Sequence, residues 1–148
     1  MCIRDSYRLE GIQGAILRIK LSHLEAWTEA RRDHARRYNE LLARSAVQTP
    51  AEMADVRHVY HVYAVRTPRR DALQQALNAQ GIQTNIHYPI PVHLLPAHAD
   101  LGHARGAFPH AESAADQVLS LPMFPELTEE QIATVAQGIR EAMASLPA

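Results

Sequence analysis

Apolar positions with helical spacing run through the first third of the chain, over residues 7–43. The positions that carry this spacing are Leu9, Ile12, Ile16, Ile19, Leu24, Trp27, Tyr38, Leu41 and Leu42. A single helix over this range would be about 55 Å long at 1.5 Å per residue, which is longer than a domain of this size. We therefore expect the helix to break near Ser22 or to lie against something outside this chain.

A strand–helix–strand pattern follows. Residues 58–65 are rich in β-branched and aromatic side chains and predict a central strand. Thr67 and Pro68 fit the N-cap and first position of a helix that ends at Gly81. Apolar and polar residues alternate over residues 82–88, which predicts a strand with one apolar and one polar face. The order is that of a βαβ unit, and whether its two strands are neighbours stays open.

The second half of the chain predicts further short elements. Residues 94–108 indicate a loop with a short helix, residues 109–118 a helix, and residues 119–122 a short strand. A capping box at residues 128–131 opens a last helix, whose buried face is formed by Ile132, Val135, Ile139 and Met143. The fold class is therefore α/β, with a small mixed sheet of two or three strands, helices packed around it and a long N-terminal helical segment.

Length and composition limit the organisation and the setting. The chain has 148 residues, of which 47% are hydrophobic and 21% charged, as expected for one domain. Residues 1–6 do not share the pattern that follows, so we expect a non-native or truncated start, with residues 7–148 as a single domain. A net charge of −1 gives no overall attraction to nucleic acid or membrane, and no apolar run approaches a membrane span. The single cysteine excludes an internal disulfide and fits a reducing, cytoplasmic setting.

Arginines gather in the middle of the first helical segment, at Arg31, Arg32, Arg36 and Arg37. They could form a patch for an anionic ligand or nucleic acid, or a solvated helix face with charge pairs at i, i+4. We favour the solvated face, because no aromatic residues for stacking interleave with the arginines.

Candidate chemistry concentrates in residues 81–93. The strand predicted there ends on an imidazole and a phenol, His87 and Tyr88, and two prolines stiffen the turn that leads to His93. Side chains held in place before a ligand arrives lose less entropy on binding. From spacing alone, two ordinary surface histidines at a strand end are the simpler interpretation.

Metal and lysine chemistry find little support in the pattern. Histidines recur at short intervals, at His87, His93, His98, His103 and His110. None of these spacings places two imidazoles on one helical face, so we expect no metal site. The chain contains one lysine, Lys20, and any lysine chemistry must use it.

Four segments in order, residues 7–21, 60–66, 81–93 and 120–128, resemble the C-terminal part of the sugar aminotransferases of the DegT/DnrJ/EryC1/StrS family. The resemblance implies the small domain of a fold type I aminotransferase that uses pyridoxal phosphate in amino sugar biosynthesis. In such a homodimeric enzyme an amino donor, usually glutamate, charges the cofactor, and the amine then passes to a nucleotide-linked keto sugar.

The resemblance also carries an expectation about activity. In the family the N-terminal large domain supplies the Schiff-base lysine, the carboxylate partner of the cofactor and most of the phosphate site. Lys20 lies at a position that the family does not use for the Schiff base. This chain alone is therefore expected not to transaminate.

Few functional positions carry over from the resemblance. Arg8 matches an arginine that reaches across the dimer to the cofactor phosphate or the substrate, while Ser6 replaces the asparagine that precedes it in the family. His87 and Tyr88 match contacts to the nucleotide sugar, and His93 matches a histidine of the same substrate-binding motif.

A non-enzymatic alternative stays open, in which the chain is a small domain or fragment that binds a nucleotide or a partner protein. This alternative predicts a large exposed apolar patch along residues 9–24.

Overall fold

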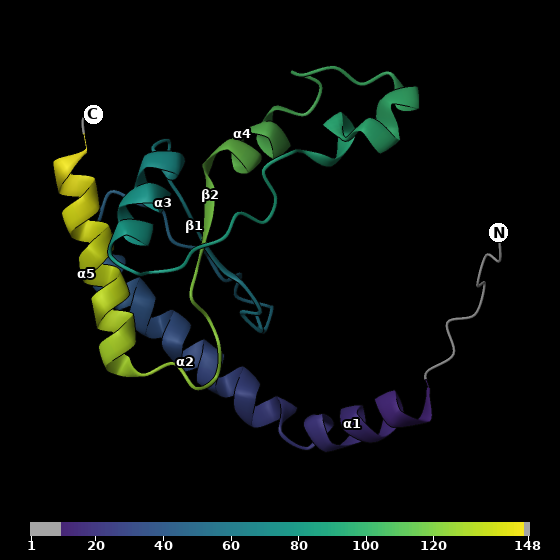
Figure 1. Ribbon diagram of the computed structural model, residues 1–148, viewed down its shortest axis with the longest axis vertical. Helices are drawn as coiled ribbons and strands as arrows, with labels where there is room; N and C mark the ends of the chain where they lie inside the picture. Colours follow the sequence, from purple (N-terminus) through teal and green to yellow (C-terminus); the bar gives the residue numbers. More distant parts are fainter. Residues whose placement is uncertain (1–9, 147–148) are drawn as a thin grey trace.

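The N-terminal helical segment divides into two helices. In this computed structural model, which describes residues 10–146, α1 (Gly11–Leu21) and α2 (Leu24–Leu42) meet at a turn of Ser22 and His23. The Ser22 hydroxyl donates to the carbonyl of Ile19 at 2.7 Å. Such a bond from side chain to backbone competes with the backbone hydrogen bonds that would continue the helix. The predicted break near Ser22 is confirmed, and α1 extends away from the other elements (Figure 1).

A two-stranded antiparallel sheet forms the centre of the fold. β1 (Tyr63–Arg66) pairs with β2 (Val118–Leu121) along its whole length. On the other edge of β2, Asn85 exchanges two backbone hydrogen bonds with Ser120, at 3.1 and 2.7 Å. β2 therefore lies between β1 and the segment that contains Asn85, so the two segments predicted as strands of a βαβ unit are not neighbours.

Two predicted strands are shorter than the sequence pattern indicates. Residues 58–62 are not part of the strand: Tyr60 has a φ of +45°, and its N–H donates to the ring of His58 at 2.9 Å. Residues 82–88 form a single bridge in place of a regular strand. Their side chains nevertheless alternate as predicted, with Ile82 and Thr84 buried and the polar residues between them exposed.

The helix after β1 begins later than predicted. α3 (Arg70–Ala79) starts beyond Thr67 and Pro68 because the N–H of Thr67 continues the strand pairing and donates to the carbonyl of Gln117 at 3.1 Å. The hydroxyl of Thr67 accepts instead from the N–H of Arg69, at 3.3 Å. The prediction of Thr67 as N-cap is therefore wrong by two residues.

The end of α3 agrees with the prediction. Gly81 has a φ of +77°, and the N–H of Ile82 donates to the carbonyl of Leu77 at 2.9 Å. This is the Schellman arrangement, in which glycine accepts the left-handed conformation without steric cost. The turn directs the chain from α3 to the edge of β2.

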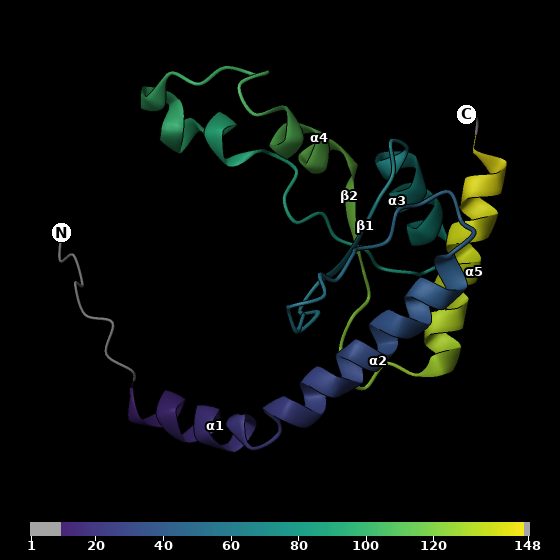
Figure 2. The same ribbon diagram turned by 180° about the vertical axis from the view of Figure 1, so that it is seen from behind.

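The last helix, α5 (Glu129–Ser145), closes the core. Thr128 and Gln131 form the predicted capping box, with side chain to backbone distances of 3.0 and 3.2 Å. α5 packs against both α2 and α3 (Figure 2), and the four residues predicted for its inner face are buried. The largest fully buried apolar side chains of the core are Tyr38, Leu42, Tyr63, Leu73, Leu77, Leu119, Ile132 and Ile139.

Residues 89–108 form an excursion beyond the sheet that returns through α4 (Pro109–Gln117). The excursion contains two short 3-10 helices, Val92–Leu94 and Pro96–Leu101, and it projects away from the core (Figure 1). The predicted short helix, the helix at 109–118 and the short strand after it are confirmed.

α1 buries none of its residues. Ile12 is 77% exposed, and the other exposed apolar side chains of this surface are Ile16, Leu17, Ile19, Leu21 and Leu24. The apolar patch expected along residues 9–24 is therefore present from Ile12 on, whereas Leu9, Arg8 and residues 1–6 lie outside the described residues. Between residues 10 and 146, no helix combines the length and apolar character needed to cross a membrane.

Candidate functional site

His87 and Tyr88 lie together where residues 82–88 leave the edge of β2. The ring nitrogen Nδ1 of His87 is 2.9 Å from the hydroxyl of Ser120. The rings of His87 and Tyr88 meet edge to face, with centroids 5.6 Å apart, and Tyr88 is 75% exposed. The central strand thus anchors the imidazole, while the phenol beside it is open to solvent.

A small cavity of about 180 Å³ lies next to this pair, and we call it the His87 cavity. Its walls are formed by His61, Val62, Gln83, Asn85, His87, Ser120, Leu121, Pro122 and Met123. The sequence analysis did not single out His61, Asn85 or Ser120. The alternation over residues 82–88 was a signal for Asn85, but the contact between Ser120 and His87 joins distant parts of the chain and has no local signal.

His93 has a different environment. Its side chain is 8% exposed, and its Nε2 is 3.1 Å from a carboxylate oxygen of Glu112 on α4. The His93 ring also packs on Phe108 with centroids 4.8 Å apart. It lines a separate cavity of about 400 Å³, the His93 cavity, together with Val92, His98, Leu101, His103, Phe108 and Ala111. The structure therefore brings His87 and Tyr88 together and places His93 elsewhere.

Glu112 organises this second region. Its carboxylate accepts hydrogen bonds from the N–H of Gly106, at 2.8 and 2.9 Å, and from the N–H of Phe108, at 3.2 Å. Burial acts to raise the pKa of Glu112, but these two N–H groups and His93 outweigh it and hold the pKa below its usual value. The sequence analysis missed Glu112, because its partners come from a loop whose path the local pattern does not reveal.

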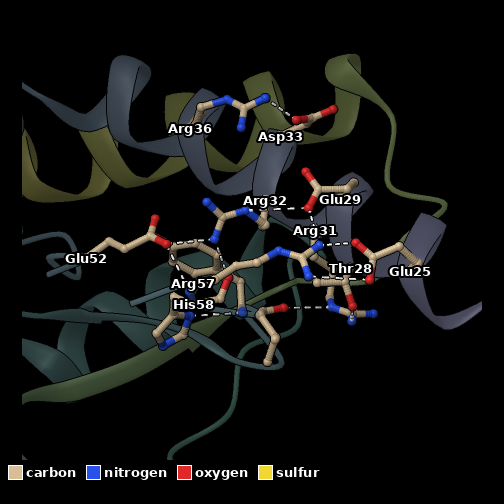
Figure 3. A network of polar contacts seen from close by, with 12 residues as sticks. Glu25, Thr28, Glu29, Arg31, Arg32, Asp33, Arg36, Glu52, Arg57 and His58 are labelled. Carbon is tan, nitrogen blue, oxygen red and sulfur yellow. Dashed lines mark hydrogen bonds and ion pairs between the residues drawn. The ribbon is translucent and has the colours of Figure 1, made fainter. Parts of the chain in front are cut away.

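Three of the four arginines named on α2 are paired with carboxylates. Arg31 donates instead to the hydroxyl of Thr28 and to the carbonyl of Val59, both at 3.0 Å. Arg32 contacts Glu52 at 2.6 Å and lowers the pKa of that carboxyl (Figure 3). Arg37 contacts Glu40 at 2.9 Å. Arg36 is likewise paired with Asp33 on the same helix. The predicted solvated face with charge pairs is confirmed for Arg36 and Arg37, whose pairs are spaced at i, i+3 and not at i, i+4. Arg31 and Arg32 are half-buried and contact residues 52–59 instead.

The residues around Lys20 include no acidic partner within the described part of the chain. Lys20 is exposed on α1 and lines a cavity with Gly14, Leu17, Arg18, Leu21, Leu24 and Trp27, none of which is a carboxylate. A Schiff-base lysine of this cofactor works beside an acidic partner for the pyridine nitrogen. The same part of the chain also contains no group of three or more histidine, cysteine or acidic side chains placed to hold a metal ion.

Comparisons with known proteins point to one family. The sequence pattern of the DegT/DnrJ/EryC1/StrS aminotransferase family matches residues 4–140. The "Pleiotropic regulatory protein" of Geobacillus stearothermophilus is 50% identical over 137 residues, which are 90% of this chain and 37% of that protein. The dTDP-3-amino-3,4,6-trideoxy-alpha-D-glucose transaminase of Streptomyces venezuelae is 44% identical over 135 residues, which are 90% of this chain and 36% of that protein.

The fold agrees with these matches. The crystal structure of S. venezuelae DesV in complex with a ketimine intermediate superposes with a TM-score of 0.90 at 40% identity, covering 98% of this chain and 42% of that one. The chain thus spans little more than a third of the length of its relatives, and the part that it matches is their C-terminal portion. It belongs to the DegT/DnrJ/EryC1/StrS aminotransferase family, which is pyridoxal-phosphate-dependent.

Proposed function

We propose that this chain is the C-terminal, substrate-contacting part of an aminotransferase that acts on a nucleotide-linked keto sugar, with an amino acid such as glutamate as donor. Family membership over residues 4–140 supports the reaction class. The relative from S. venezuelae, named as a transaminase of a dTDP-linked sugar, supports the substrate class.

His87 and Tyr88 are the proposed substrate contacts. The observation that carries this assignment is the pairing of an imidazole, anchored on Ser120 and lining the His87 cavity, with an adjacent phenol that is 75% exposed. Both groups can form hydrogen bonds with diphosphate oxygens and sugar hydroxyls. His93 was predicted as a further contact, but its Nε2 faces Glu112, so in this proposal it supports the turn.

The cofactor would be held mainly by sequence outside the described residues. Bound pyridoxal phosphate supplies the electron sink through which an amine is exchanged for a carbonyl group. Lys20 is exposed and has no carboxylate among the residues that line its cavity. We therefore propose that this chain alone is inactive. Arg8, which lies outside the described residues, stays a candidate for the cofactor phosphate or the substrate across a dimer.

The exposed apolar face of α1 supports a homodimer or a larger chain as the working form. Apolar side chains that are half exposed or more run along this helix from Ile12 to Leu21, and such a contiguous surface marks a place where protein packs. The single cysteine, Cys2, goes with a cytoplasmic location for that assembly.

The second candidate function is binding without catalysis, of a nucleotide or of a partner protein. The position of Lys20 on the surface favours it, since no other lysine of this chain could form the Schiff base.

A chimera separates the two candidates. The C-terminal portion of the S. venezuelae transaminase is replaced by the matching part of this chain, and amine transfer from glutamate to the dTDP-linked keto sugar is measured. We expect activity in the chimera and none in this chain alone. His87→Ala and Tyr88→Phe should raise KM in the chimera, whereas His110→Ala, at an exposed position of α4, should not. A chimera that binds the cofactor but transfers no amine would overturn the proposal.

A further inference from the structure

The His87 cavity contains more polar groups than the two predicted contacts explain. Gln83, Asn85 and His87 reach it from one face of the same extended segment, as the alternation of this segment requires. His61 lines it from the turn that precedes β1, and Ser120 from the central strand. Polar side chains from three separate parts of the chain therefore converge on one small space.

The polar groups in this cavity suit an uncharged ligand rich in hydroxyls. Amide and hydroxyl side chains offer both donors and acceptors, as the hydroxyls of a sugar do, and imidazole nitrogens add further hydrogen-bonding groups. Within the described part of the chain, the cavity walls include no lysine, arginine or carboxylate. A phosphate group selects charged donors, arginine above all, so the chemistry favours a sugar ring over a phosphate.

The size of the cavity agrees with this chemistry. A volume of about 180 Å³ corresponds to about six water molecules in the liquid, well below the 300 Å³ or more of a pocket for a drug-sized ligand. A single sugar ring is compatible with this space, and a whole nucleotide is not. The side chains of Val62, Pro122 and Met123 add apolar wall, against which the C–H face of a sugar ring can pack.

The His87 cavity contains polar side chains that are free to bind. Among the contacts of the described residues, no hydrogen bond or ion pair engages the side chain of His61 or of Asn85. The backbone N–H and C=O of Asn85 both pair with Ser120, at 3.1 and 2.7 Å. The position of the Asn85 side chain at the cavity is therefore fixed by the backbone. His87, by contrast, already uses one ring nitrogen on Ser120.

We propose that the His87 cavity is the subsite for the sugar ring of the substrate, and that His61 and Asn85 are residues that determine which sugar it accepts. The inference rests on the proposed function for the substrate class. It adds where each part of the substrate binds: the sugar ring lies in the cavity, and the nucleotide diphosphate lies outside it, beside Tyr88. Asn85 lies next to His87 on the same face of the segment. A change of its side chain therefore alters the hydrogen bonds available to the sugar and leaves the contact between His87 and Ser120 in place.

Binding of dTDP-glucose and of dTDP to the full chain tests this division. We measure both affinities by ligand-observed NMR, and we define the sugar increment as their ratio. His61→Ala and Asn85→Ala should each reduce the sugar increment about tenfold while the affinity for dTDP stays the same, because tenfold corresponds to the loss of one hydrogen bond of good geometry. Saturation transfer should also reach the protons of the glucose ring in the unchanged chain.

Matched controls show whether a loss is local. His110→Ala and Asn78→Ala remove the same side chains at exposed positions of α4 and α3, and they should leave the sugar increment unchanged. Both test residues are themselves exposed, so thermal unfolding should show that their variants fold as the unchanged chain does.

The outcomes distinguish the two proposals. The sugar subsite is wrong if dTDP-glucose binds no more tightly than dTDP, or if His61→Ala and Asn85→Ala leave the sugar increment unchanged. In either case the proposed function is still judged by the activity of the chimera. If the active chimera keeps its KM when His87 is replaced, the substrate contact itself is wrong. If the chain binds neither compound, the subsite in this chain is refuted.

Discussion

His87 and His93 lie close together in one stretch of chain, yet their surroundings are opposite. His87 is exposed and is held by one neutral hydroxyl, that of Ser120. His93 is 8% exposed and faces a carboxylate, that of Glu112, which two backbone N–H groups also contact. The first arrangement leaves an imidazole available to a ligand, and the second uses the imidazole to hold a loop.

The difference shows what decides the role of a histidine. Both residues flank the same stiff, proline-containing turn, so the local sequence treats them alike. Their roles diverge through partners that come from β2 in one case and from α4 in the other. The comparison therefore predicts large effects on stability at His93 and Glu112, and effects on binding at His87.

The largest effect on stability is expected for Glu112→Ala. This change removes the acceptor of two backbone N–H groups and of His93, and buried donors without partners are costly. We expect a fall in Tm of roughly 5 °C or more, together with faster amide hydrogen exchange at Gly106 and Phe108. Glu126→Ala, at an exposed position, is the control. An unchanged Tm would contradict the structural role of Glu112.

A smaller loss is expected for His93→Ala. The variant removes the ring that packs on Phe108, but Glu112 keeps its two backbone partners. We expect a loss of about 1–3 kcal/mol in the free energy of unfolding, measured by urea denaturation. The comparison would be broken if His93→Ala cost no more than His110→Ala.

The dependence of stability on pH should follow from Glu112. Its pKa in the folded chain lies below the usual 4.5, so the unfolded state binds more protons near that pH, and stability falls as pH falls through the folded pKa. We expect Glu112→Gln to lose less stability than the unchanged chain between neutral pH and pH 3. Parallel curves for the two proteins would show that Glu112 does not contribute in this way.

The smallest effect on stability is expected for His87→Ala. Because the ring is exposed and has one neutral partner, the free energy of unfolding should change by less than about 0.5 kcal/mol. The same variant should weaken binding of dTDP-glucose in ligand-observed NMR. A loss of stability as large as that of His93→Ala would remove the contrast between the two residues.

Local signals predicted much of the fold. The capping box of Thr128 and Gln131 marks the start of α5, and Gly81 marks the end of α3, since each of these features acts through residues close in sequence. The break at Ser22 followed from the length of the helical pattern. The strand at residues 58–62 was mispredicted, because the positive φ of Tyr60 and its bond to His58 outweigh a favourable composition.

The candidate site was only partly predictable for a related reason. Alternation and two prolines pointed to His87 and Tyr88 as the end of a stiff segment, and the structure places their rings together. The partners that set the roles of His87 and His93, Ser120 and Glu112, are distant from them in sequence. Such contacts depend on the path of the whole chain, so a local pattern does not contain them.

The most direct test of the contrast follows the imidazole signals of His87 and His93 by NMR while dTDP-glucose is added to the chain. The account predicts that the His87 signals shift as the ligand saturates its site, and that the His93 signals stay in place because Glu112 and Phe108 enclose that ring. Shifts at His93 equal to those at His87, or no shift at His87 when the ligand is bound, would contradict it.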